Sequence, residues 1–493
     1  QVEDPKLAKK LVKRDVVQII TPGANLDLNS NENNYIASIY MDVRQSFLCY
    51  ADISTGEMKI QTMESSKEKI LEKLLSLDIK EIVLPTNVDA NFVLYLKSNS
   101  NVCVSYYNDD SASIEDEPLF VNLNDPRQIA VTARLYNYLK NMERRELSYF
   151  KPVINLMEKK TMKIDYSAQS NMELLKSLDN KTFGTLYWLL NQTKTPMGAR
   201  YLKNQIVNPS ASYQEIERRQ NLTSVFVDHF LDRENLREDL SGIFDMERLI
   251  ARMGYENCNG HDLLQLKKSL SALPQIQKDL SHLGQYKEIE EISQRLGDHS
   301  NLVNLLENAI SENCPTTITE GEIFKKGYNK DLDELIYLTT EAKEWITNLE
   351  IQEKERTGIH NLRVGFNSVF GYYIEVSASQ IPFVKPEFGY IRKQTIKTGE
   401  RYITEELKEK EDKILRAKEL RCTLEAKLFR ELRKQVSQYT DSIQQTSDAI
   451  SELDYFLNLA YVASENNYKR PHFNGENKID VIQARHPIIE KAA

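Results

Sequence analysis

The sequence has few cysteines, and they follow no regular spacing. The five residues are scattered without a C-x-x-C pair: Cys49, Cys103, Cys258, Cys314 and Cys422. The seven histidines show no i, i+4 pairing. These absences exclude a disulfide framework and a structural zinc site, and they indicate free thiols in a reducing cytosol.

Long apolar runs are also missing. No window of about 18 uninterrupted apolar residues occurs, so we expect no membrane span. The N-terminus lacks the basic-then-apolar pattern of a signal peptide, and we expect a cytoplasmic protein. With 493 residues, 41% of them hydrophobic and 28% charged, the chain should hold several helix-rich domains.

An overall basic charge is absent as well, since the formal net charge is −9. The distribution is uneven, however. Residues 385–402 carry five basic side chains against two acidic ones. A local excess of this kind is usually a solvated surface, and charge alone does not establish binding to nucleic acid.

Glycine and proline are absent from Glu405 to Arg470. As one helix, these 66 residues would span roughly 100 Å. The preceding segment, 361–402, alternates at period two and has glycines at turn points, which predicts a small β-module. Thr404 is placed to cap the long helix, and we expect a break at Tyr439–Ser442.

Residues 35–145 alternate strands and helices, which predicts one sheet-based α/β domain. The expected elements are a hairpin at 35–53, strands at 81–85 and 102–104, and helices at 66–77, 89–97 and 127–143. Further strands are predicted at Val16–Ile20 and Ile479–Ile482. From about residue 150 the spacing becomes helical, with helices at 213–232, 235–253, 259–280, 286–310 and 329–354 and a break at Pro274.

Several longer stretches resemble one family in order along almost the whole chain. They are QVEDPKLAKKLVKRDVVQIITPG (1–23), TPMGAR (195–200), FGYYIEV (370–376), YIRKQT (390–395), ERYITEELKEKEDKIL (400–415) and QARHPIIE (483–490). Together they resemble the bacterial MutS family of DNA mismatch-repair proteins. The resemblance implies a cytoplasmic homodimer that encircles mismatched double-stranded DNA and a MutL-like repair partner.

The resemblance also implies a multidomain, mainly α-helical fold class. It implies an RNase H-like α/β connector and a long-helix lever and core domain with a small inserted β clamp. The implied boundaries are 1–20 for the end of the mismatch-reading domain, 21–148 for the connector, 149–351 for lever and core, 352–404 for the clamp, 405–472 for the returning lever and 473–493 for the start of an ATPase domain.

The family's ATP and Mg²⁺ chemistry has no counterpart in these residues. No G-x-x-x-x-G-K-[ST] stretch occurs, so no loop here is expected to hold nucleotide phosphates. We expect neither a catalytic site nor a cofactor or metal in this chain, although the full-length family is a DNA-dependent ATPase.

The resemblance to the clamp indicates six candidate DNA-binding residues: Asn367, Arg392, Lys393, Lys397, Thr398 and Arg401. Basic side chains neutralise phosphates regardless of sequence, and short polar groups at turns donate to phosphate oxygens. Thr398-Gly399 departs from the family's usual asparagine before alanine. Arg401 has a rival role as the i, i+4 ion-pair partner of Glu405.

Two adjacent tyrosines leave a further question open. Alternation places Tyr372 and Tyr373 on opposite faces of their strand, so at least one is expected in the core. We assign Tyr372 to packing and leave the role of Tyr373 open between packing and stacking on bases.

Two alternative functions remain at this stage. Asp52 follows a strand, as in RNase H-like nucleases that hold Mg²⁺ between several carboxylates, and Asp42 and Glu81 are the other candidates. A polar turn at Asp52–Glu57 is the simpler interpretation. The third hypothesis is a helical protein–protein scaffold that does not bind DNA.

Overall fold

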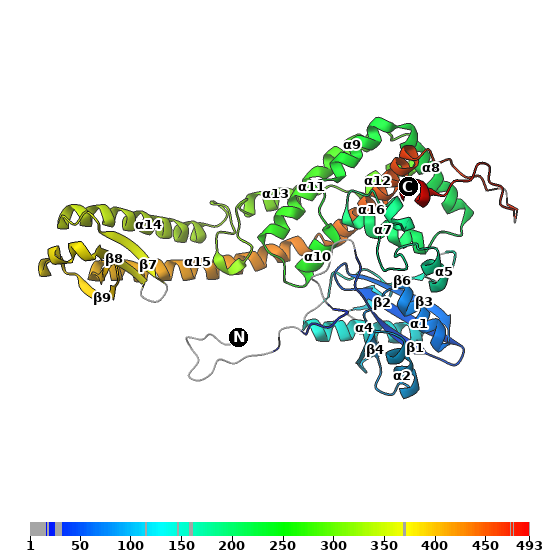
Figure 1. Cartoon of the computed structure of the whole chain (residues 1–493), viewed down its shortest axis with the longest axis horizontal. Helices are drawn as coiled ribbons and strands as arrows, with labels where there is room; N and C mark the ends of the chain where they lie inside the picture. Colours follow the sequence, from blue (N-terminus) through cyan, green and yellow to red (C-terminus); the bar gives the residue numbers. More distant parts are fainter. Residues whose placement is uncertain are drawn as a thin grey trace. The chain divides into compact units, whose positions relative to one another are not determined.

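The computed structural model describes residues 16, 19–24, 32–113, 116–144, 147–156, 161–367, 371–473, 475–476 and 478–492. The chain divides into two compact units. Unit 1 comprises residues 1–258, 265–303 and 436–493, and unit 2 comprises 259–264 and 304–435. Figure 1 shows the elements of both units.

Unit 1 contains a six-stranded mixed sheet in the order β5-β4-β1-β2-β3-β6. An antiparallel meander, β1 (Tyr35–Met41), β2 (Gln45–Asp52) and β3 (Glu57–Glu64), forms its centre. The strands β4 (Glu81–Leu84), β5 (Cys103–Tyr106) and β6 (Ile154–Asn155) join it in parallel pairs. The alternation of the sequence therefore produces the predicted α/β domain.

Helices cover both faces of this sheet. Residues of α1 (Lys67–Ser76) and α2 (Ala90–Asn99) share one apolar cluster with Ala37 and Leu48. α4 (Pro126–Glu143) packs on the other face, against β1, β2 and β4. A short helix, α3 (Glu117–Phe120), precedes α4. The sheet is thus the middle layer of three.

The rest of unit 1 is helical and is built around α16 (Thr440–Glu465). Its neighbours include α6 (Leu186–Leu190), α7 (Pro196–Val207), α8 (Tyr213–Asp228), α9 (Phe230–Leu240), α10 (Met246–Gly254) and α12 (Lys287–Arg295). α16 is buried on most sides, as expected of a helix enclosed by others, and its buried residues include polar ones such as Ser447, Asp454 and Asn458. The short helices α5 (Tyr166–Asn171) and α17 (Pro487–Ala492) also belong to this unit.

The TPMGAR segment (195–200) packs against α16 and is hydrogen-bonded to it. Thr195 caps α7, because its hydroxyl accepts from the Gly198 amide at 3.0 Å. Asp454 of α16 is fully buried and accepts from the amides of Lys194 and Thr195 and from the Thr195 hydroxyl. A Cβ atom on Gly198 would stand 2.2 Å from Asp454 Oδ2, so only glycine allows this approach.

Unit 2 carries a four-stranded antiparallel sheet in the order β7-β8-β10-β9. Its strands are β7 (Arg363–Asn367), β8 (Gly371–Ser377), β9 (Ile391–Ile396) and β10 (Gly399–Ile403), and short 3-10 turns at Ala378–Phe383 and Pro386–Phe388 join β8 to β9. Another 3-10 turn, Ile318–Glu320, precedes the long helix α14 (Lys330–Thr357). This sheet is the β-module predicted from the alternation of residues 361–402.

The module is inserted between α14 and α15 (Glu405–Ser437). Leu349 and Leu407 share one apolar cluster, and the ammonium of Lys410 lies over the ring of Trp345. Further along, Leu335 and Leu420 line one groove. As residue numbers rise on one helix they fall on the other, so the two helices pack antiparallel, as predicted.

The predicted helix signals around α15 are confirmed. The Thr404 hydroxyl accepts from the Leu407 amide at 3.2 Å. α15 ends at Ser437 and α16 begins at Thr440, within the predicted break. The 33 residues of α15 span roughly 50 Å, so the segment is not a single 100 Å helix.

Other predicted helix boundaries are wrong. Pro274 lies inside α11 (Gly260–Ser281), where buried Leu270, Leu273 and Ile276 outweigh a proline cost of ~3 kcal/mol. The helix expected at 286–310 is two helices, because Gly297 has φ +67° and Asp298 accepts from the amide that begins α13 (Ser300–Ala309). Residues 213–253 form three helices, since His229 ends α8 and Asp245 caps α10.

Two predicted strands are also wrong. Val16, Ile19 and Ile20 lie outside any strand, and Val17 and Gln18 are outside the described residues. Ile479–Ile482 likewise form no strand. A strand requires a neighbouring strand to satisfy its amides and carbonyls, and in the described part of the chain neither segment belongs to a sheet; the Ile19 amide donates instead to the carbonyl of Met142 at 2.9 Å. The connector at 1–15 lies outside the described residues.

Candidate nucleic-acid interface

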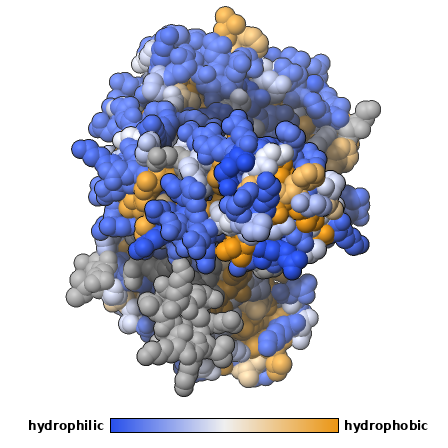
Figure 2. Space-filling view, turned by 90° about the vertical axis from the view of Figure 1, so that its left-hand side faces the viewer, coloured by the Kyte–Doolittle hydropathy of each residue, from blue (hydrophilic) through white to orange (hydrophobic). Residues whose placement is uncertain are grey.

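Five of the six candidate residues lie on one hairpin of unit 2, Arg401 on β10 and the other four on β9 and the turn. Arg392 and Lys393 belong to the edge strand β9, and Lys397 and Thr398 form the two-residue turn to β10. All four side chains are exposed. Figure 2 views the molecule from the side on which Figure 1 draws this sheet, and most of the visible surface is hydrophilic.

A β-bulge determines which way these side chains point. Arg401 is opposite Gln394, whereas Tyr402 is opposite Arg392, so Lys393 is the additional residue. In a regular strand Arg392 and Gln394 would share a face. The bulge sends Gln394 to the face of Arg401 and Arg392 to the face of Tyr402.

Arg392 is tethered but accessible. Its guanidinium lies 3.3 Å from Glu400, and its side chain is 65% exposed. The Tyr402 hydroxyl also donates to Glu400, and these hydrogen bonds, that from Tyr402 first, hold the pKa of the Glu400 carboxyl below its usual value. Burial raises the pKa of Tyr402 to about 12. The carboxylate therefore stays ionised near neutral pH and steadies Arg392.

Arg401 has a different environment. Its Nε donates to Glu375 at 3.0 Å and its Nη1 to Gln394 at 3.1 Å, and the guanidinium lies 4.2 Å from the centre of the Tyr373 ring. The proposed i, i+4 pair with Glu405 is wrong, because strand pairing brings Glu375 directly opposite Arg401. The structure also shows where the two tyrosines lie. Tyr372 packs against the apolar cluster, and Tyr373 lies on the other face beneath Arg401.

Asn367 does not lie with the hairpin residues. It is the last residue of β7, the opposite edge strand, and pairs with Gly371 at the start of β8. The turn at Lys397 and Thr398 lies near Ser377, at the other end of β8. Seven residues of strand separate the two ends, roughly 20 Å.

The sequence interpretation missed Arg363. This exposed residue of β7 is opposite Glu375, on the same face as Arg401. The signal was available, because Arg363 lies at the period-two spacing that places Gly365 and Asn367 on that face. It extends the basic character of the sheet toward β7.

The carboxylates of the nuclease hypothesis do not converge. Asp42 pairs with Arg127, at the end of the β1–β2 pair opposite Asp52. Hydrogen bonds, first from the Val43 amide and then from Arg127, lower the pKa of Asp42. Glu81 accepts from the Gly23 amide and the hydroxyls of Ser105 and Tyr138. Among the described residues, no three His, Cys, Asp or Glu side chains gather as metal ligands would.

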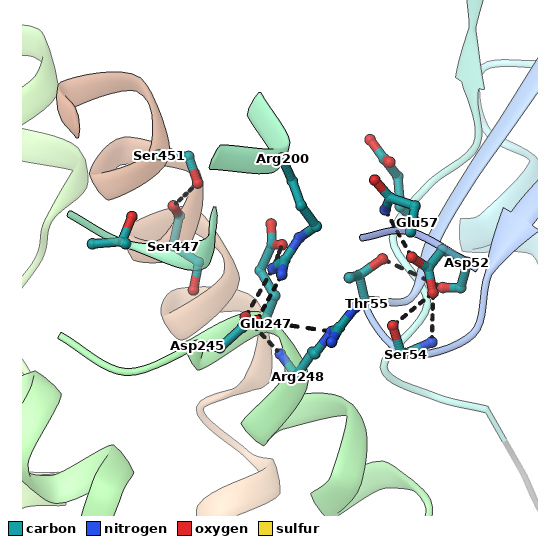
Figure 3. A network of polar contacts seen from close by, with 12 residues as sticks. Asp52, Ser54, Thr55, Glu57, Arg200, Asp245, Glu247, Arg248, Ser447 and Ser451 are labelled. Carbon is teal, nitrogen blue, oxygen red and sulfur yellow. Dashed lines mark hydrogen bonds and ion pairs between the residues drawn. The ribbon is translucent and has the colours of Figure 1, made fainter. Parts of the chain in front are cut away.

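Asp52 itself is buried in a polar turn (Figure 3). Its oxygens accept from the Ser54 amide and hydroxyl and from the Asn33 side chain. Burial raises the pKa of Asp52, and these hydrogen bonds oppose that rise. The carboxylate is thus engaged in holding the loop, in line with the simpler interpretation.

The same region of unit 1 holds a buried ionic network. Arg200 donates to Asp245 at 2.6 and 2.8 Å and to Glu247 at 2.7 Å. Burial lowers the pKa of Arg200, but the two carboxylates outweigh burial and raise it. Arg248 donates to the carbonyl of Glu32. The ion pairs join α7 to α10, and the hydrogen bond of Arg248 joins α10 to the segment that leads into β1, which is a structural role.

Comparisons with known proteins agree with this architecture. The family model described as MutS domain II matches residues 34–151, which include the mixed sheet, and MutS domain III matches residues 167–460. The fold is therefore that of two consecutive MutS domains. The multidomain, mainly helical fold class predicted from the sequence is confirmed.

Curated relatives give the same result. The chain is 40% identical over 495 residues to the DNA mismatch repair protein MutS of Bacillus subtilis (strain 168), covering all of this chain and 57% of the relative. It is 37% identical to the protein of that name from Staphylococcus aureus (strain JH9), covering 56% of it. This chain belongs to the MutS family and spans a little over half the length of these relatives. No described helix is long and apolar enough to cross a membrane.

Proposed function

We propose that this chain is the DNA-holding and signal-transmitting region of a mismatch-repair protein. In this proposal it grips the backbone of double-stranded DNA without reading the base sequence. The exposed hairpin with Arg392, Lys393 and Lys397 is the observation that carries the proposal, and the names of the relatives support it.

Binding to the DNA backbone requires only positive charge and hydrogen-bond donors near the phosphates. A basic group that neutralises a phosphate releases condensed counterions, and this gain does not depend on base sequence. Lysine makes point-charge contacts, so Lys393 and Lys397 suit a backbone grip better than base recognition. Thr398 adds a hydroxyl that donates to a phosphate oxygen. The antiparallel pair of α14 and α15 supports the sheet, and a conformational change would reach the sheet through these two long helices.

Further features of the family enter as parts of the same proposal. The full-length protein would act in the cytoplasm as a homodimer on mismatched duplex, with a MutL-like partner. It would use ATP and Mg²⁺, whose chemistry is phosphate hydrolysis. The 493 residues contain no G-x-x-x-x-G-K-[ST] loop that would hold the phosphates of a nucleotide.

The proposal is tested by fluorescence-anisotropy titration of the chain with matched and mismatched duplexes. We expect binding that weakens steeply between about 50 and 200 mM salt. The affinity should not depend on the mismatch, because backbone contacts carry no sequence information. Absence of binding at low salt would contradict the proposal and support a helical scaffold. Mg²⁺-dependent cleavage lost in Asp52→Asn would support the nuclease.

A further inference from the structure

The outer face of the sheet in unit 2 carries a stacked pair that the sequence interpretation did not identify. The ring of Tyr373 lies across Gly365 of the neighbouring strand, where an added Cβ atom would stand 2.9 Å from the ring. The guanidinium of Arg401 covers the ring at 4.2 Å. Glycine at 365 thus lets the ring lie flat against the sheet.

The charge of Arg401 is balanced within the sheet. Glu375 accepts from its Nε, Gln394 accepts from its Nη1, and the side chain is only 20% exposed. The β-bulge in β9 places Gln394 on this face. Lys393 and Lys397 differ, because both are exposed and no described carboxylate pairs with either. Two kinds of basic residue therefore stand side by side, one neutralised and fixed, the other free to neutralise a phosphate.

The face continues into the basic hairpin. Arg401 lies on β10, directly beside β9, and Arg363 extends the same face on β7. Gly365 and Arg401 cover the two faces of the half-buried ring, so the surface that remains is the edge of the ring together with the stacked guanidinium. This surface is rigid and of low conformational entropy, and it suits the apolar edge of a deoxyribose. The neighbouring lysines would hold the phosphates on either side of that sugar.

We propose that Tyr373 and Arg401, fixed by Glu375 and Gln394, form a contact platform for the sugar–phosphate backbone of duplex DNA. In this platform Arg401 is a positioning residue rather than a counterion-releasing phosphate ligand. The inference rests on the proposed function and specifies how the backbone is held.

The salt dependence of duplex binding distinguishes a platform from a phosphate contact. We expect Tyr373→Ala to weaken binding about fivefold, the equivalent of one aromatic contact, with no change in the slope of log K against log salt. Tyr373→Phe should retain the wild-type affinity. Glu375→Gln should steepen the slope by up to about 0.9, because it frees the charge of Arg401.

Matched controls separate the platform from a loss of folding. Tyr337→Ala removes a tyrosine that is 66% exposed on α14 and should leave binding unchanged. Thermal unfolding monitored by circular dichroism checks that each variant is folded. The inference is overturned if Tyr373→Ala binds like the wild type, or if Arg401→Ala lowers the slope by about 0.9 as a phosphate ligand would. If the wild-type chain does not bind duplex at low salt, the proposed function fails first and the platform fails with it.

Discussion

Replacing Arg392, Lys393 and Lys397 together by glutamine should abolish most of the affinity of this chain for duplex DNA. Each phosphate contact contributes about tenfold at ~50 mM salt, and its loss lowers the salt slope by about 0.9. The triple variant should therefore bind on the order of 1,000-fold more weakly, equally for all sequences, as measured by anisotropy titration at several salt concentrations. The side chains are exposed, so the fold should not change.

A matched control separates local contacts from net charge. Lys69, Lys97 and Lys287 are exposed lysines of unit 1, and changing all three to glutamine alters the net charge equally. This control should retain duplex binding within a few-fold, because exposed charges beyond about 10 Å are screened. Equal losses in the two triple variants would show that the hairpin has no special role.

The largest effect on stability is expected from Asp454→Ala. The buried carboxylate accepts from two amides and a hydroxyl at the start of α7, and its removal leaves these donors unsatisfied. We expect the free energy of unfolding to fall by about 3–5 kcal/mol. Asp454→Asn keeps one acceptor oxygen and should lose less, about 1–2 kcal/mol. Urea titration followed by circular dichroism measures both.

Glu465→Ala provides the control for this experiment. Glu465 is an exposed carboxylate in the last turn of the same helix, and its removal should change the free energy of unfolding by no more than about 0.5 kcal/mol. If Asp454→Ala were as stable as this control, the role assigned to the TPMGAR segment would be wrong.

Much of the fold could be predicted from local signals. The strands expected at 35–53, 81–85 and 102–104, the β-module, the Thr404 cap and the break near Tyr439 depend on neighbouring residues, and all are found, whereas β3 and β6 were not predicted. Local signals were misleading where tertiary packing decides whether a helix or strand forms. Pro274 remains inside a helix because its neighbours are buried, and Ile479–Ile482 form no strand because, among the described residues, no neighbouring strand is available.

The candidate site shows the same limit. Sequence proximity correctly grouped Arg392, Lys393, Lys397 and Thr398 on one exposed hairpin. It could not show that Glu375, 26 residues away, neutralises Arg401, because that pair depends on strand order and register. The bulge that turns Gln394 toward Arg401 likewise depends on how β9 pairs with β10, and no local sequence pattern predicts it.

The central claim is that duplex DNA contacts the chain at the β9–β10 hairpin. A photo-crosslinking amino acid placed at Thr398, in the turn between these strands, tests it most directly. The account predicts efficient crosslinking to a labelled duplex at low salt that disappears at high salt. The same amino acid at Leu94, exposed on α2 of unit 1, should give little crosslinking. Duplex that crosslinks equally at the two positions, or only at Leu94, would contradict the account.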